Sequence, residues 1–163
     1  MAEIIQPEPR LVSLYGMYII GVEARTTNRD EENGATAQIP ALWQRFTEEK
    51  LLDAIPDPRE PTVMLGAYTR YQSDDKGPYS VIVGAEACGL DRIPPNMVGI
   101  TVLAQEYLIF TAAGEMPAAV IDGWKQVWKY FSGTTVLKRA YTTDFERYDS
   151  ARPNEVEIHI AVR

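Results

Sequence analysis

A short stretch near the C-terminal end of the sequence brings carboxylates and aromatic rings together. With the two-residue period of a strand, residues 138–149 place Tyr141, Thr143 and Phe145 on one face. The opposite face carries Thr142, Asp144, Glu146 and Tyr148. A buried anion without a partner costs far more free energy than a buried methyl group gains. This acidic and aromatic face is therefore typical of a site that an incoming cation completes.

Few residues are available for other kinds of chemistry. The single cysteine, Cys88, has no partner for an internal disulfide, and with one histidine the chain lacks a zinc-binding Cys/His set. A nucleophilic pair of Cys88 and His159 is an alternative, but Cys88 lies in an apolar run that predicts a buried strand. We find no Ser-His-acid order and no phosphate-binding glycine loop. We therefore assign no catalytic residue, no metal and no cofactor.

Size and composition indicate one globular domain over residues 1–163. Hydrophobic residues make up 45% of the chain and charged residues 24%, which is typical of a folded protein and argues against disorder. No apolar run approaches the roughly 20 residues of a membrane span, and Glu3 lies where a signal peptide carries basic residues. We expect a cytoplasmic protein without membrane contact.

The charge balance favours a cationic ligand over nucleic acid. The formal net charge is −7, which repels a phosphate backbone, and no cluster of Lys and Arg on one face offsets it. Many proteins are acidic for solubility alone. We expect no direct binding to nucleic acid, and a cationic small molecule suits the balance better.

The first half of the chain predicts one strand, one helix and two further strands. Residues 11–24 are strand-like, and Gly16 and Gly21 mark a bulge or the close approach of another segment. A helix begins near Pro40, which suits the first helical position because its missing N–H has no intrahelical partner there. The other features of this half are an apolar helix stripe of Leu42, Trp43, Phe46, Leu51 and Leu52, a loop over 25–36, and strands over 62–71 and 79–89.

The second half repeats this order. Residues 97–112 predict a long strand, and a helix opens after Gly114 with apolar residues at i, i+3, i+4 and i+7. Strands over 136–148 and 156–162 follow. We therefore predict an α+β fold, a duplicated strand-helix-strand-strand unit with pseudo-two-fold symmetry and an antiparallel sheet. Its parts are an N-terminal tail over 1–10, a first half over 11–92, a second half over 97–163, and a central ligand groove between the halves.

A set of segments in this order and spacing resembles the GyrI-like small-molecule-binding family. The segments are residues 39–46, 77–84, 107–110 with Gly114, 124–131, 144–149 and 156–162. The family includes the effector-binding domain that multidrug regulators of the AraC and MerR types carry behind a DNA-binding domain. The resemblance implies the duplicated fold and a pocket for lipophilic cations, closed by a glutamate on the next-to-last strand that corresponds to Glu146.

Two features of the sequence depart from the family pattern. The family often ends in Glu-x-Tyr-x-Pro-Val, whereas this chain has Glu157, His159, Ala161 and Val162, so an imidazole replaces a tyrosine. The sequence also contains no helix-turn-helix. We expect a stand-alone member that senses through a separate protein partner or sequesters its ligand.

The resemblance assigns further residues to the pocket. Trp43 and Trp124 lie where the family's helices edge the pocket, although core packing is the usual role of such residues. Tyr79 corresponds to an aromatic residue after a glycine, and Tyr148 shares the face of Glu146. The predicted ligand-binding set is Glu146, Tyr148, Tyr79, Trp43, Trp124, Glu157, His159 and Phe110, where Glu157 and His159 are alternatively a solvent-facing pair and Phe110 alternatively core.

Other conspicuous side chains receive structural interpretations. Trp128 and Phe46 lie on apolar helix faces and are expected in the core. The acidic run of Asp30, Glu31 and Glu32 is expected to be a solvated loop without a further role.

Three functions remain open from the sequence. The first is binding of cationic, hydrophobic, drug-like molecules in an aromatic pocket with an acidic floor. The second is hydrolysis of small electrophilic compounds, in which Glu146 activates a water and Tyr148 or Tyr79 donates a proton. The third is a protein-binding module similar to the gyrase inhibitors, which acts through its surface.

Overall fold

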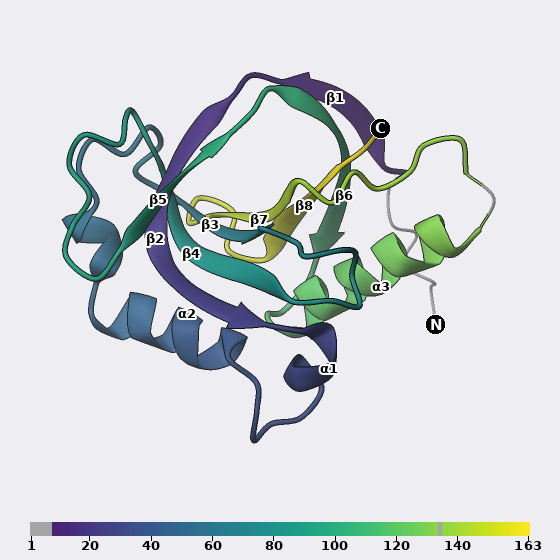
Figure 1. The fold of residues 1–163 in the computed structure, drawn as a ribbon, viewed down its shortest axis with the longest axis horizontal. Coiled ribbons are helices and arrows are strands. Elements are labelled where there is room, and N and C mark those ends of the chain that lie inside the picture. The colour runs from purple at the N-terminus through teal and green to yellow at the C-terminus, as the bar shows by residue number, and fades with distance from the viewer. Residues whose placement is uncertain (1–7, 134) are drawn as a thin grey trace.

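The computed structural model describes residues 8–133 and 135–163 and shows an α+β fold (Figure 1). One antiparallel sheet of eight strands curls into a half-barrel. The predicted tail over residues 1–10 falls mostly outside the described residues, and Arg10 already belongs to the first strand. Among the described residues, no helix combines the length and the apolar character needed to cross a membrane.

The elements follow the chain in two similar series. The first series is β1 (Arg10–Leu14), β2 (Met17–Thr26), α1 (Asn28–Glu31), α2 (Ile39–Glu48), the 3-10 helix η1 (Leu51–Ala54), β3 (Val63–Thr69) and β4 (Tyr79–Ala87). The second series is β5 (Val98–Val102), β6 (Gln105–Ala113), α3 (Ala118–Ser132), β7 (Thr143–Asp149) and β8 (Glu155–Ala161).

The strand order confirms the predicted duplication. The sheet runs β1-β6-β8-β7-β3-β4-β2-β5, so β3 and β7 pair at its centre and each half contributes three strands on its own side. The two edge strands are exchanged. Strand β1 precedes the first half in sequence but pairs with β6 of the second, and β5 precedes the second half but pairs with β2 of the first.

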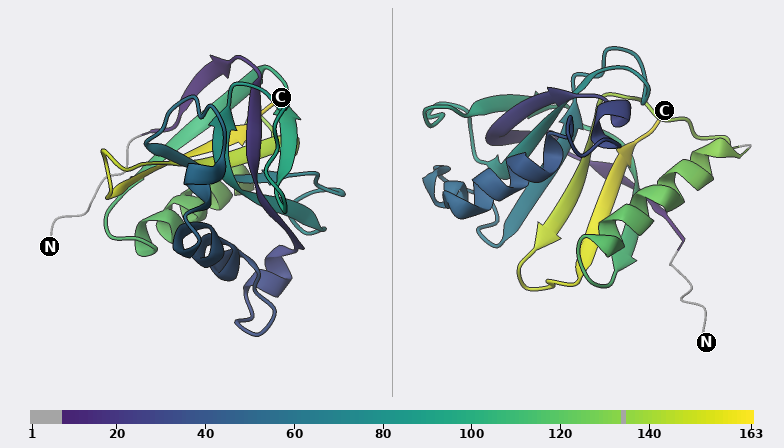
Figure 2. Two further views of the ribbon diagram at one scale, coloured as in Figure 1. Left: turned by 90° about the vertical axis from the view of Figure 1, so that its left-hand side faces the viewer. Right: turned by 90° about the horizontal axis from the view of Figure 1, so that it is seen from below.

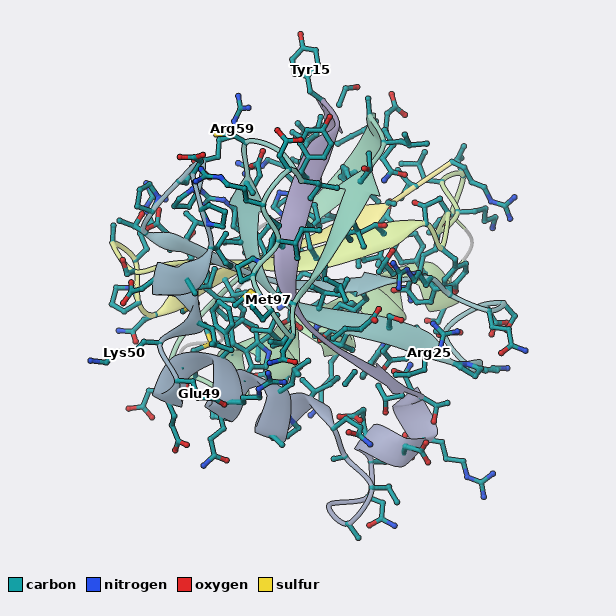
Figure 3. The ribbon with its side chains drawn as sticks, turned by 60° about the vertical axis from the view of Figure 1, so that its left-hand side comes forward. Tyr15, Arg25, Glu49, Lys50, Arg59 and Met97 are labelled. Carbon is teal, nitrogen blue, oxygen red and sulfur yellow. The ribbon has the colours of Figure 1, made fainter. Side chains whose placement is uncertain are left out.

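This exchange explains two errors in the strand prediction. The continuous strands expected over 11–24 and 97–112 are each two strands, separated at Tyr15 and Gly16 and at Leu103 and Ala104. The corners lie against each other, because a Cβ atom on Gly16 would be 2.9 Å from the carbonyl oxygen of Val102. Tyr15 projects from its corner with 93% of its surface exposed (Figure 3). Neither corner carries a polar turn motif, so the apolar pattern continues through both.

Three other segments differ from the prediction. Strand β7 begins at Thr143 rather than near residue 136, and Arg139 forms only an isolated bridge with Val162. The expected loop over 25–36 contains the end of β2 and helix α1, whose N-cap is Thr27. Strand β4 ends at Ala87, so Cys88 is exposed instead of buried.

Both long helices cover the same outer face of the sheet (Figures 1 and 2). Helix α2 packs on the first half through Leu42 and Phe46, and the predicted core position of Phe46 is confirmed. Helix α3 packs on the second half through Val127. The inner face holds a third apolar cluster that includes Phe145 and Tyr107. Alternate residues of the central strands β3 and β7 therefore face opposite environments.

Candidate functional site

A cavity of about 1000 Å³ lies on the outer face of the sheet, between residues of α2 and α3. Its volume is at the upper end of the range for small-molecule sites. The central strands β3 and β7 supply one wall, and the facing sides of the two helices supply the others. The aromatic lining consists of Trp43, Tyr68, Tyr71, Tyr79, Trp124, Trp128 and Tyr148.

Glu146 lies on the wall of this cavity with only 4% of its surface exposed. Three side chains donate hydrogen bonds to its carboxylate: the Tyr68 hydroxyl (2.7 Å) and the Trp124 indole N–H (2.6 Å) to Oε2, and the Tyr148 hydroxyl (2.7 Å) to Oε1. All three donors are neutral. Among the described residues, Glu146 has no ion-pair partner.

Burial raises the pKa of Glu146 above its usual value, while the hydrogen bonds from Tyr68, Trp124 and Tyr148 oppose this rise. The pKa values of Tyr68 and Tyr148 are raised as well, because burial and the nearby carboxylate of Glu146 both disfavour a phenolate. The tyrosines therefore stay protonated and donate. The carboxylate is held in place by its donors but has no ion pair with any of the residues that the structure describes.

The rings around Glu146 form two edge-to-face pairs. Trp43 of α2 lies 5.1 Å from Tyr148, and Trp124 of α3 lies 5.1 Å from Tyr68, measured between ring centroids. Each pair joins a helix of one half to a central strand of the other. Aromatic pairs in this geometry stabilise by about 0.5–1.5 kcal/mol beyond their buried area. The two halves thus build the site together.

One end of the cavity is more polar. Tyr79 lies there with its hydroxyl donating to Asn28 Oδ1 (2.7 Å), and its ring packs 5.7 Å from Tyr71. Behind the Tyr71 ring, Asp144 is fully buried and accepts hydrogen bonds from the Tyr71 hydroxyl (2.6 Å) and from Arg139 (2.9 Å). Unlike Glu146, Asp144 has a guanidinium partner. Its charge is therefore balanced within the protein.

Five of the predicted residues come together in this cavity: Glu146, Tyr148, Tyr79, Trp43 and Trp124. The other three lie elsewhere. Phe110 faces α3 in the core, with its ring 5.6 Å from that of Tyr130. Glu157 and His159 lie on the inner face of β8, because β8 turns Ile158 and not its neighbours toward α3.

His159 is a buried inner residue rather than a replacement for a pocket tyrosine. Its ring stacks on Phe145, 4.2 Å between centroids. Burial lowers the pKa of His159 to about 3, so the imidazole is neutral. Since Cys88 is exposed beyond the end of β4, the alternative of a Cys88–His159 nucleophilic pair finds no support.

Sequence reasoning did not assign several residues that line the cavity, among them Tyr68, Trp128 and Glu31. Tyr68 was missed because its segment lies outside those that carry the family resemblance, although its side chain is on the face of β3 that lines the cavity. Trp128 was expected in the core, but it lines the cavity and is 46% exposed. Glu31 was expected in a solvated loop, but it lines the cavity and accepts hydrogen bonds from the backbone N–H groups of Gln38 (2.8 Å) and Ile39 (2.9 Å).

Comparison with known proteins places this architecture in a family. The model of the family "Cass2: integron-associated effector binding protein" matches residues 10–162. An integron cassette protein from the mobile metagenome of Vibrio cholerae is 40% identical, with 97% of each chain covered and a TM-score of 0.81. No curated protein is significantly similar in sequence.

More distant structures share the fold. The protein SAV2435, solved with bound tetraphenylphosphonium, is 21% identical over 96% of this chain and 94% of its own, with a TM-score of 0.78. The C-terminal domain of EcmrR is 10% identical over 96% and 97% of the two chains, with a TM-score of 0.63. Because the family model matches residues 10–162 and the integron cassette protein is 40% identical, the chain belongs to the integron-associated effector-binding proteins, a family of small-molecule-binding proteins with the GyrI-like fold.

Proposed function

We propose that this protein binds cationic, hydrophobic small molecules in the cavity between α2 and α3, and that it senses or sequesters them. The observation that carries this proposal is the buried carboxylate of Glu146, which has three neutral donors and no positive partner among the described residues. A buried charge without an opposite charge is costly, and a bound cation supplies that charge.

The aromatic lining adds to the attraction for a cation. A desolvated cation within about 6 Å of a ring face gains roughly 0.5–2 kcal/mol per favourable contact. Trp43 and Trp124 approach Glu146 from the two helices, and the tyrosines of the central strands lie between them. Because ring faces and edges tolerate many shapes, such a site discriminates by charge and apolar area more than by exact outline.

The relatives support the ligand class. SAV2435 carries tetraphenylphosphonium, a lipophilic cation, in its structure. Together with the buried, unpaired Glu146, the shared fold favours this class over neutral or anionic compounds.

The proposal is tested by titrating the protein with tetraphenylphosphonium, followed by calorimetry and by tryptophan fluorescence. Replacing one partner of a buried charge pair costs about 2 kcal/mol or more, so we expect Glu146→Gln to weaken binding roughly 30-fold or more. Glu106→Gln, an exposed glutamate of β6, is the matched control and should bind like the wild type. Equal affinity of Glu146→Gln and wild type refutes the proposal.

Two further assays separate the other functions. Consumption of a reactive ester, abolished by Glu146→Gln, identifies a hydrolase instead. If no cation binds and the protein captures one stoichiometric protein partner, its surface is the functional element.

A further inference from the structure

The site is built around a pseudo-two-fold axis that passes between β3 and β7. Equivalent positions of these strands are 80 residues apart (143 minus 63 and 149 minus 69, their first and last residues). Gly66 and Glu146 have this offset and also face each other directly in the antiparallel register. Only residues on the axis satisfy both conditions, so Gly66 is the symmetry counterpart of Glu146.

The surrounding rings obey the same symmetry. Tyr68 and Tyr148 are 80 residues apart (148 minus 68), and Trp43 and Trp124 are 81 apart (124 minus 43). The contacts match as well, since each tryptophan meets the tyrosine of the other half at 5.1 Å. The four rings are therefore two copies of one arrangement. Symmetry is broken at the axis, where one half has a carboxylate and the other a hydrogen atom.

The missing side chain at position 66 determines where Trp43 lies. A Cβ atom on Gly66 would be 2.8 Å from Cζ2 of Trp43 and 3.3 Å from Oε1 of Glu146. The first distance is far shorter than the 3.5–4.0 Å of an unstrained carbon–carbon contact, whereas the second is a tight contact that a shift of a few tenths of an ångström relieves. The indole of Trp43 thus occupies the space that a side chain at position 66 would fill, directly beside the carboxylate.

The two tryptophans are held differently as a result. Trp124 donates its N–H to Glu146, which fixes its ring. Trp43 makes no side-chain hydrogen bond within the described part of the chain, so packing determines its position, against Gly66 and Tyr148 and against the apolar cluster that contains Leu42 and Phe46.

We propose that Gly66 is a positioning residue for the cation site. By carrying no side chain, it lets Trp43 close over Glu146 and sets the distance between the ring and the charge of the ligand. This inference rests on the proposed function. It adds that the glycine on the axis, which touches no ligand itself, controls affinity through Trp43.

The test compares Gly66→Ala with Gly99→Ala for binding of tetraphenylphosphonium. Both glycines lie in strands, and a Cβ atom on Gly99 would also meet side-chain atoms at 2.8 Å, those of Ile93 and Leu90, outside the cavity. We expect Gly66→Ala to weaken binding roughly 2- to 30-fold, the equivalent of one impaired cation–ring contact. Gly99→Ala should bind like the wild type.

A double-mutant cycle with Trp43→Ala shows whether the effect passes through Trp43. In the Trp43→Ala background, the alanine at position 66 meets no indole, so Gly66→Ala should have little further effect. If the two substitutions weaken binding additively, or if Gly66→Ala binds like the wild type, the inference is wrong. If Gly66→Ala alone fails to fold, restored folding by Trp43→Ala supports the clash, and unrestored folding contradicts it.

A measurement without ligand keeps this test separate from the proposed function. The protein is labelled with 5-fluorotryptophan, and its three tryptophan signals are assigned by substitution. Gly66→Ala should shift the fluorine signal of Trp43 and leave that of Trp128 unchanged. An unchanged Trp43 signal refutes the positioning role even if the cation binds. A shifted signal without cation binding in the wild type upholds the positioning role and refutes the binding function.

Discussion

At the scale of single residues, Glu146 is the proposed counter-charge of the ligand, and its burial costs stability. Its carboxylate is almost fully buried, and its three hydrogen bonds come from uncharged groups. Burial raises its pKa in the folded protein above the usual value of 4.5. The folded state therefore holds a proton more tightly than the unfolded chain does. Stability falls as the pH rises from about 4.5 through this raised pKa.

The direction of this pH dependence of stability leads to a prediction for the protein without ligand. Glu146→Gln removes the ionisable group, so the variant should be more stable than the wild type at neutral pH while binding cations more weakly. Urea denaturation at neutral pH measures the difference in free energy of unfolding. The gain should disappear at a pH well below 4.5, where Glu146 is protonated in both states. A variant less stable than the wild type at neutral pH contradicts this assignment.

At the scale of elements, Glu31 connects α1 to the start of α2. The N-cap of α2, Gln38, makes no capping hydrogen bond with its side chain. Glu31 supplies the missing acceptor, because its two carboxylate oxygens receive the N–H groups of Gln38 and Ile39. A carboxylate at this end also interacts favourably with the helix dipole. The first turn of α2, which leads to Trp43, depends on this contact.

Glu31→Ala should therefore lower the free energy of unfolding by roughly 1–2 kcal/mol, the usual effect of losing an N-terminal cap. Thermal denaturation measures the loss, and Glu32→Ala, which removes the same charge from an exposed neighbour, serves as the control. Equal stability of the two variants would show that Glu31 is not a cap. Binding of tetraphenylphosphonium to Glu31→Ala should weaken as well, because Trp43 follows the first turn of α2.

Elements with a clear hydrophobic period were predictable from the sequence, and their ends were not. Both long helices were found because their apolar residues recur at helical spacing. The corners at Tyr15 and Leu103 were missed because a sharp bend between apolar strands leaves no polar signature. The late start of β7 was missed because residues 136–142 contain no Gly, Pro, Asn or Asp that would mark a turn, whereas Tyr141 has a positive φ of 54° that no strand adopts.

The candidate site was also predictable only in part. A strand pattern shows that two residues share a face but not which face lines the cavity. The face that Glu146 and Tyr148 share lines it, whereas His159, which was predicted as a pocket residue, lies on the inner face of β8. Tyr68 was missed because its partner, Glu146, is 78 residues away in the sequence. Glu31 was missed because its partners are backbone N–H groups at the start of α2, which no residue type reveals. Pairing of β3 with β7 was needed to see Tyr68 beside Glu146.

At the scale of the whole molecule, the cavity belongs to both halves. Helix α2 and strand β3 come from the first half, and α3 and β7 from the second, while the exchanged strands β1 and β5 tie the halves together. A ligand in this position contacts both copies of the duplicated unit. Its binding should therefore stabilise the fold as one unit rather than one half of it.

Hydrogen exchange with and without tetraphenylphosphonium measures this coupling. At a free concentration 100 times its dissociation constant, the cation should stabilise the protein by about 2.7 kcal/mol. Slower exchange should appear in α2 and β3 as well as in α3 and β7. Protection confined to one half would contradict a site shared between them.

The most direct test of the central claim is the affinity for tetraphenylphosphonium as a function of pH. In the proposed function the cation binds the ionised form of Glu146, and burial raises the pKa of that group in the free protein. We expect the affinity of the wild type to be constant near neutral pH and to fall about tenfold per pH unit below this pKa, whereas Glu146→Gln binds weakly and without this dependence. A wild-type affinity that stays constant from about pH 8 to about pH 4, or a pH dependence that persists in Glu146→Gln, would show that Glu146 is not the counter-charge of the ligand.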